Sequence, residues 1–310
     1  MAWTFEILLK SEAEFSATEG PVWTGNELRF THIPRSRILR YDPKSGAIDV
    51  WRTDTNRTNG LCFDAEGRLF GCCAGGRSIV RFDPSGKDTV VVDRLDTKRL
   101  NTPNDLAVDR KGRIWFTNPV NEANWDATER PELDHREVLR ADPQPDGSYR
   151  VTRVTSGMTQ PNGILVSRNN RTLYVAESGY DPKVDRELRA YPILEDGSLG
   201  SYDLLFAWGA DARGVHRGID GMCLDTEGNI IATNGWEVAG PGSMLTVFSP
   251  TGRVLETHPL FVNRPSNVCF GGRDMRTVFV TSICGQLLKA QTDLVGWAMY
   301  PRPRGRAVSV

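Results

Sequence analysis

The most regular feature of this chain is a short apolar run that follows a polar doublet, and it occurs six times. The doublets are Glu19-Gly20, Asn59-Gly60, Asn104-Asp105, Asn162-Gly163, Asp220-Gly221 and Ser266-Asn267. Their first residues are 40, 45, 58, 58 and 46 positions apart. A repeat of this length is typical of propellers and solenoids, in which each repeat is one structural unit.

The pattern within each unit predicts four short strands. The apolar run leads through a tight turn into a second run, as at residues 63–70 and 108–116, and this pattern predicts a β-hairpin. A third run ends in a Pro turn at residues 38–43, 79–84, 138–143 and 245–250, and a fourth follows at 47–51 and 89–92. Proline marks the strand ends because it cannot donate to a ladder. The sequence therefore predicts an all-β, six-bladed β-propeller, whose first and last blades close the ring by sharing strands from both termini.

The repeats indicate a single domain. They run from about residue 15 to about residue 292 with no linker rich in Ser, Gly or Pro between them. We expect one propeller domain over residues 1–310, with a solvated basic tail at about 301–310. An open array or a seven-bladed ring is the alternative arrangement of the same repeats.

The charge balance gives no sign of a polyanionic partner. The chain has 38 Lys and Arg residues against 39 Asp and Glu residues, a net charge of −1, so we expect neither nucleic acid nor a membrane surface to bind. Residues 1–10 lack the pattern of a signal peptide, and no apolar run approaches the length of a membrane span. The six cysteines show no zinc-site spacing, and reduced thiols in a cytoplasmic protein are favoured over a disulfide framework. We expect a monomer or a small homo-oligomer.

The first residues of the six doublets occupy equivalent positions in the repeat. They are Glu19, Asn59, Asn104, Asn162, Asp220 and Ser266. Equivalent positions in a closed radial array form a ring, and this ring offers oxygen atoms with two formal negative charges. A divalent cation such as calcium or magnesium prefers such ligands. One Asn-Gly or Asp-Gly doublet alone would indicate only a turn.

Several of these segments resemble those of a known family. The segments are Glu19-Gly20-Pro21-Val22-Trp23, Pro103-Asn104-Asp105, Gln160-Pro161-Asn162-Gly163 and Asp220-Gly221, in this order. They are similar to the senescence marker protein/gluconolactonase/luciferin-regenerating enzyme family, which includes regucalcin, and residues 264–272 resemble its bacterial gluconolactonase branch. The resemblance covers nearly the whole chain. It implies a six-bladed propeller with one divalent metal near the top of the central channel.

The resemblance also implies roles for particular residues. Glu19, Asn162 and Asp220 fall on the metal ligands, and Asn104 falls on an asparagine that contacts metal or substrate. Calcium is the first choice because the candidate ligands are hard oxygens, and Mg²⁺, Mn²⁺ or Zn²⁺ could substitute. One position departs from the family: the animal branch has an arginine where this chain has Thr102. The substrate contact of that arginine cannot be carried over.

The remaining candidates are substrate contacts from the ring and from an insertion in the third blade. They are Asn104, Asn59, Ser266, Trp125 and His135. The insertion, at residues 118–137, breaks the strand pattern, and it is either a lid over the site or a plain surface loop.

These features favour a metal-dependent lactonase acting on a sugar lactone such as gluconolactone. A metal at the ring would polarise the lactone carbonyl, and Asp220 is the favoured base for the attacking water, with Glu19 as the alternative. The same site could serve a phosphotriesterase or aryl esterase, and a calcium-binding propeller without activity is a third reading. No Gly-x-Ser-x-Gly sequence is present, which argues against a serine hydrolase.

Overall fold

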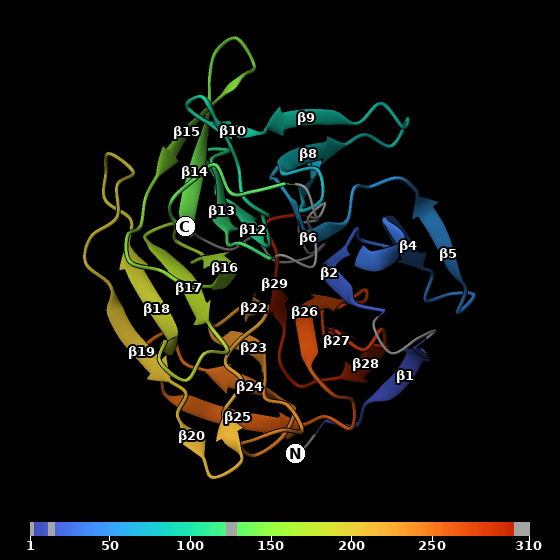
Figure 1. Cartoon of the computed structure of the whole chain (residues 1–310). Coiled ribbons are helices and arrows are strands. Elements are labelled where there is room, and N and C mark those ends of the chain that lie inside the picture. The colour runs from blue at the N-terminus through green and yellow to red at the C-terminus, as the bar shows by residue number, and fades with distance from the viewer. Residues whose placement is uncertain (1–2, 12–15, 122–128, 301–310) are drawn as a thin grey trace.

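Six antiparallel sheets surround a central channel in the computed structural model, which describes residues 3–11, 16–121 and 129–300 (Figure 1). Blade 1 is β2 (Thr18–Trp23), β3 (Leu28–His32), β4 (Arg37–Tyr41) and β5 (Ile48–Arg52). Blade 2 is β6 (Thr58–Phe63), β7 (Leu69–Cys73), β8 (Ser78–Phe82) and β9 (Thr89–Val92). Blade 3 is β12 (Leu106–Val108), β13 (Ile114–Asn118), β14 (Glu137–Pro143) and β15 (Tyr149–Arg153).

The second half of the chain repeats the arrangement. Blade 4 is β16 (Pro161–Val166), β17 (Thr172–Ser178), β18 (Arg186–Pro192) and β19 (Asp203–Ala207). Blade 5 is β22 (Met222–Asp225), β23 (Ile230–Asn234), β24 (Met244–Phe248) and β25 (Val254–Pro259), with a fifth strand, β29 (Gly296–Trp297), beside β22. Blade 6 is β26 (Pro265–Gly271), β27 (Thr277–Ser282), β28 (Leu287–Gln291) and β1 (Glu6–Leu9). The predicted six-bladed propeller is confirmed, and β29 is an unforeseen addition.

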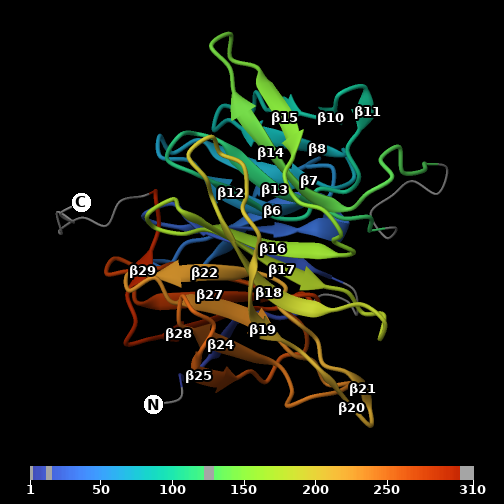
Figure 2. The same cartoon turned by 90° about the vertical axis from the view of Figure 1, so that its left-hand side faces the viewer.

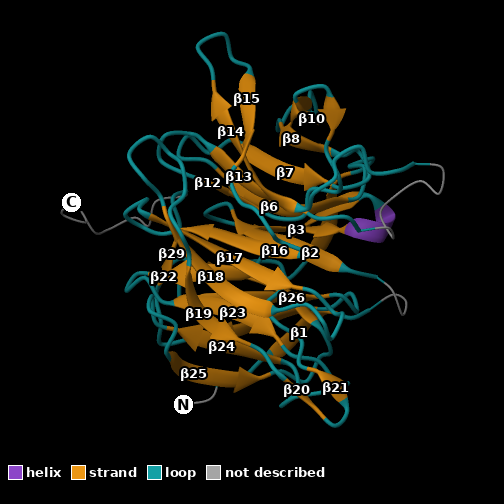
Figure 3. Cartoon of the chain, turned by 60° about the vertical axis from the view of Figure 1, so that its left-hand side comes forward, coloured by secondary structure: helices purple, strands orange, loops and turns teal. Residues whose placement is uncertain are grey.

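Short elements complete the described structure. They are the hairpins β10 (Arg94–Leu95) with β11 (Lys98–Arg99) and β20 (Ala210–Asp211) with β21 (Gly214–Val215), and the 3₁₀ turn η1 (Ile33–Arg35). Strands dominate the ribbon, and η1 is the only helical turn among the described residues (Figure 3). No helix in that part of the chain is long and apolar enough to cross a membrane.

The core lies between neighbouring blades. Apolar side chains, mostly from the first three strands of each blade, pack against those of the next sheet in five clusters, and the large rings of Phe30, Phe70, Trp115, Phe248 and Phe279 are almost completely buried in them. The outermost strands keep exposed apolar side chains such as Val50 and Val90. Burial therefore falls from the channel to the rim, where the outermost strand of each blade is an edge that faces solvent.

Irregular pairing places the polar doublets at one end of the channel. The register shifts between Glu19 and Val22, Thr58 and Leu61, Pro161 and Ile164, and Pro265 and Val268. In blades 3 and 5 the inner strand begins only after the doublet. A bulge bends a strand and re-aims its side chains, and bulges gather next to active sites. We call this end of the molecule, at the start of all six inner strands, the doublet end.

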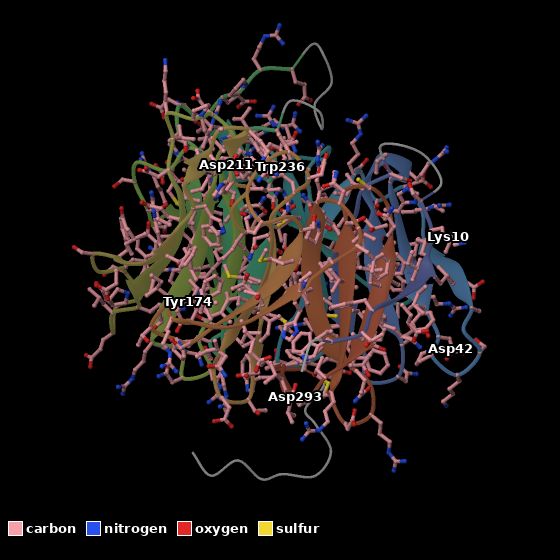
Figure 4. The ribbon with its side chains drawn as sticks, turned by 90° about the horizontal axis from the view of Figure 1, so that it is seen from below. Lys10, Asp42, Tyr174, Asp211, Trp236 and Asp293 are labelled. Carbon is pink, nitrogen blue, oxygen red and sulfur yellow. The ribbon has the colours of Figure 1, made fainter. Side chains whose placement is uncertain are left out.

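The two ends differ in the elements they carry. The second strand of each blade runs antiparallel to the inner strand and therefore ends at the doublet end. The loops after β17 and β23 consequently lie at this end. The hairpins β10–β11 and β20–β21 project on one side of the molecule and β29 lies on the other (Figure 2). Trp236 and Asp211 share one end, whereas Tyr174 and Asp293 lie at the opposite end (Figure 4).

The N-terminal segment closes the ring by pairing with the last blade. β1 pairs with β28, so blade 6 contains strands from both halves of the chain. Trp3 then stacks on His258 with the ring centroids 3.7 Å apart, and its indole Nε1 donates to Asp293 Oδ1 at 3.2 Å. Trp3 is 8% exposed, so this contact fastens the chain end to blade 5.

Replacing Trp3 with Ala is expected to lower the free energy of unfolding by about 3 kcal/mol. Removal of the indole ring leaves a cavity that the surrounding strands cannot collapse to fill. Urea unfolding followed by circular dichroism measures this change. The control Val90→Ala, at an exposed position of β9, should change the free energy by less than about 0.5 kcal/mol. Equal stability of Trp3→Ala and the parent would show that the N-terminal contact does not hold the ring closed.

Candidate functional site

Three carboxyl groups converge inside the channel at the doublet end. Glu19, Asp105 and Asp220 are 4%, 8% and 7% exposed. Burial raises the pKa of Glu19 well above its ordinary value, and repulsion from Asp220 and Asp105 raises it further. Like charges buried this close favour the protonated form unless a cation or hydrogen-bond donors compensate. The carboxyl groups in this channel therefore need a cation or hydrogen-bond donors beside them in order to be ionised.

Asp105 is a site residue that our sequence reasoning missed. Burial raises its pKa to about 7, and the charge of Asp220 acts in the same direction. The backbone N–H of Leu106 donates to its Oδ1 at 2.9 Å. Asp105 holds the second position of its doublet, where four other blades have glycine. An acid at a position that is glycine in four of the six blades was the signal that could have revealed it.

Asn267, at the same repeat position in blade 6, was also missed. Its Nδ2 donates to Glu19 Oε2 at 3.0 Å, and its side chain also hydrogen-bonds Asp105. The backbone N–H of Gly20 donates to the same Glu19 oxygen at 2.8 Å. Asn267 thus bridges two of the three carboxyl groups across the channel.

Glycine at the remaining second positions makes room for these side chains. A Cβ atom on Gly60 would lie 2.3 Å from Asp105 Oδ1, and one on Gly221 would lie 2.1 Å from Asn267 Cγ. Both distances are far below van der Waals contact. The pattern of four glycines, one acid and one amide is therefore a packing requirement of the channel.

Asp220 differs from the other two acids because it has a cationic partner. Burial raises its pKa, while the charge and hydrogen bond of Arg217 and a hydrogen bond from Asn162 oppose that shift. The guanidinium donates from Nη2 to Asp220 Oδ2. Because Oδ2 of Asp220 faces Arg217, Oδ1 is the oxygen that is left to contact a cation or a water molecule.

The asparagines of the ring add amide oxygens around these acids. Asn59 is 6% exposed, and its Oδ1 has no hydrogen-bond donor among the described residues. Asn104 and Asn162 are half-buried, and the backbone carbonyl of Asn104 accepts from Gly60 at 2.9 Å. In the described part of the chain, no three His, Cys, Asp or Glu side chains are arranged to hold a metal. A cation would therefore need amide ligands. A hard cation suits this site, because Asn59 Oδ1 has no donor among the described residues and the neighbouring carboxyl groups repel one another.

The hydroxyl of Ser266 lies between two strands. It donates to Thr18 O at 2.7 Å and is also hydrogen-bonded to the Thr281 hydroxyl, with 2.9 Å between the two oxygens, and Ser266 is fully buried. These bonds join blade 6 to blade 1. Its role as a substrate contact stays a prediction.

His135 and the described part of the insertion lie over blades 2 and 3. The charges that act on His135 belong to Arg153, Glu137, Asp134 and Lys98, and burial together with Arg153 lowers its pKa. Glu129 accepts from Arg77 and from Arg99, each at 3.2 Å. None of these groups is a channel carboxyl. Trp125 lies outside the described residues.

Two aromatic side chains line the mouth of the channel beside Asp220. Tyr180 and Trp236 have ring centroids 5.4 Å apart, and Arg217 Nε donates to the Tyr180 hydroxyl at 3.2 Å. Arg217 Nη1 also donates to Pro265 O at 2.8 Å. One buried guanidinium therefore links blades 4, 5 and 6 to the Asp220 carboxylate.

Beyond the carboxyls the channel continues as a cavity of about 170 Å³ lined mainly by apolar side chains of the inner strands. Residues 297–300 lie at its wall, and Tyr300 packs against Phe63 with centroids 5.2 Å apart. Cys62, Cys223 and Cys269 also line it, and burial raises the pKa of the Cys62 thiol to about 12. Cys62, Cys223 and Cys269 form no disulfide, and such buried, protonated thiols are poor nucleophiles.

Known proteins share this sequence pattern and architecture. Residues 17–284 match the model of the SMP-30/Gluconolactonase/LRE-like region. The gluconolactonase of Zymomonas mobilis is 28% identical over 294 residues, which cover 89% of this chain and 78% of that protein. The structure of a Xanthomonas campestris gluconolactonase superposes with a TM-score of 0.77 at 30% identity, covering 94% of this chain and 89% of the other. Regucalcin from Agrobacterium tumefaciens, described as calcium-binding, has the same fold, with a TM-score of 0.74 at 17% identity over 96% of each chain. The chain therefore belongs to the SMP-30/gluconolactonase/LRE-like family.

Proposed function

We propose that this protein is a lactonase that hydrolyses a sugar lactone at the doublet end of the channel with the help of a divalent cation. The observation that carries the proposal is the convergence of Glu19, Asp105 and Asp220, all buried, in one channel. The gluconolactonases of Zymomonas mobilis and Xanthomonas campestris, to which the chain is similar along most of its length, support the choice of substrate.

Glu19, Asn162 and Asp220 would hold the cation, with Asn104 beside it. Two carboxylates and an amide provide hard oxygen ligands, and the likeness to calcium-binding regucalcin supports calcium. When bound, the cation would supply positive charge that polarises the lactone carbonyl. Burial and then the repulsion of Asp220 and Asp105 raise the pKa of Glu19, and a cation bound between these carboxyl groups would relieve that repulsion.

The side chains of the channel would then activate water and hold the lactone. Asp220 accepts a proton from the attacking water as the water oxygen bonds to the carbonyl carbon. The bond from that carbon to the ring oxygen breaks, the proton passes to the leaving ring oxygen, and the product is a hydroxy acid. Arg217 holds the Asp220 carboxylate in place and favours its ionised form. Asn104 and Asn59 would contact the hydroxyl groups of the sugar.

A substrate screen with and without chelator tests this proposal. We expect hydrolysis of glucono-1,5-lactone and related sugar lactones above the spontaneous rate, loss of this activity after chelation, and recovery when calcium is added back. Turnover of aryl esters or phosphotriesters without lactone turnover would keep the site and discard the substrate. Calcium binding without turnover of any of these compounds would favour a non-catalytic propeller.

A further inference from the structure

Arg264 occupies an unusual backbone conformation at the doublet end. Its φ is 49°, in the left-handed region that a side chain with a Cβ atom rarely adopts, and it directly precedes Pro265. Such strained positions are costly to maintain and gather at functional sites. Arg264 stands two residues before Ser266 in the repeat, and Arg57 stands two residues before Asn59 with a φ of 53°. Two blades that flank blade 1 therefore present an arginine at the same strained position.

The guanidinium of Arg264 lies over an aromatic face and has few acceptors. Its Cζ is 5.6 Å from the ring centre of Trp236. Its Nε has no acceptor among the described residues, and its ion partner is Glu237, 3.5 Å away and half-exposed. An exposed ion pair of that length contributes little. The Arg264 side chain thus keeps most of its capacity to bind an anion.

A continuous set of contacts joins Arg264 to the reactive end of the channel. Trp236 packs against Tyr180, and Tyr180 accepts a hydrogen bond from Arg217, which also binds Asp220. Arg217 additionally donates to Pro265 O, immediately after Arg264, at 2.8 Å. A molecule whose carbonyl lies near Asp220 therefore has the aromatic pair along its side and Arg264 beyond it.

We propose that Arg264 and Trp236 form a recognition site for an anionic group, so that the preferred substrate is a sugar lactone with a carboxylate, sulfonate or phosphate away from the lactone carbonyl. This inference rests on the lactonase function proposed above. Arginine suits this task because its planar fork binds carboxylate or phosphate through two parallel hydrogen bonds, and the cation–π contact with Trp236 helps to position it. Thr102 stands at the same repeat position as Arg264, two residues before Asn104, but its side chain is uncharged and cannot serve as this anion site.

A matched pair of lactones tests the proposal. Glucaro-1,4-lactone carries a carboxylate at C6, whereas glucono-1,4-lactone carries a hydroxymethyl group on the same ring. We expect the parent protein to have at least a tenfold higher kcat/KM for the glucaro-lactone. Arg264→Met should reduce that value by about 10- to 100-fold and change the value for the glucono-lactone by less than threefold. Arg264→Lys should be intermediate, and Arg253→Met, at an exposed turn between β24 and β25, should behave like the parent.

Equal kcat/KM values for the two lactones in the parent, or equal losses for both in Arg264→Met, would overturn the proposal. Calorimetric binding of glucarate and gluconate separates it from the lactonase function. If neither lactone is turned over but glucarate binds more tightly than gluconate, and only while Arg264 is present, anion recognition stands and the lactonase proposal fails. If both lactones are turned over without any preference for the anion, the lactonase proposal stands and the role of Arg264 is wrong.

Discussion

The Asp220→Asn variant is expected to lose about 10²- to 10⁴-fold in kcat/KM for lactone hydrolysis, the usual contribution of a positioned general base. The amide cannot accept the proton of the attacking water, and it also removes a charge from the proposed cation ligands. Initial rates in a pH-stat, with the cation at saturation, measure this loss. The control Asp203→Asn, at an exposed position of β19, should retain the parent rate.

Loss of activity in Asp220→Asn has to be distinguished from loss of the fold. Arg217 is 3% exposed, so removal of the Asp220 charge leaves a buried cation without its carboxylate, which is destabilising. Circular dichroism therefore accompanies the rates, and Glu19→Gln provides an independent variant in which the Arg217 pair is intact. Full activity in a folded Asp220→Asn protein would show that Asp220 is not the base.

In the metal-free protein, the stability should fall as the pH rises from about 4 to 7. The pKa of Asp105 is about 7 in the folded state and near 3.8 in the unfolded chain. Between these values the folded protein retains a proton that the unfolded chain has released, so the free energy of unfolding decreases by up to about 4 kcal/mol. Glu19, whose pKa is also raised, acts in the same direction.

The Asp105→Asn variant should lack most of this decrease, and at pH 7 without metal it should be more stable than the parent. Urea unfolding in the presence of chelator at pH 5 and at pH 7 measures how the free energy of unfolding changes with pH in the parent and in Asp105→Asn. The control Asp203→Asn should show the same change as the parent. The same Asp105→Asn change should weaken calcium binding, because one of the three converging charges is removed. A parent protein that is equally stable at both pH values would contradict the account of the channel carboxyls.

Much of the fold was predictable from the sequence because its signal is local and repeated. The doublets, the tight turns and the Pro-terminated runs each determine a strand end, and six copies determine the number of blades. The strand β29 and the hairpins β10–β11 and β20–β21 were not predicted. Each has only two residues per strand, too few for an alternation of apolar and polar side chains to be visible.

The site was less predictable because it depends on contacts between blades. The ring positions indicated that Glu19 and Asp220 would share the channel. Asp105 and Asn267 become part of the site through side chains that meet across blades, whereas Arg217 binds Asp220 three residues further along the chain. The repeat marks the positions of Asp105 and Asn267, but only the closed ring shows that Asn267 contacts both Glu19 and Asp105.

Hydrolysis of glucono-1,5-lactone by metal-free protein, followed in a pH-stat before and after addition of calcium, tests the central claim most directly. The account predicts that chelator-stripped protein adds nothing to the spontaneous rate, that calcium restores the activity of the parent, and that calcium fails to restore Asp220→Asn. Full lactone hydrolysis by protein shown to contain no metal, or by Asp220→Asn, would contradict it.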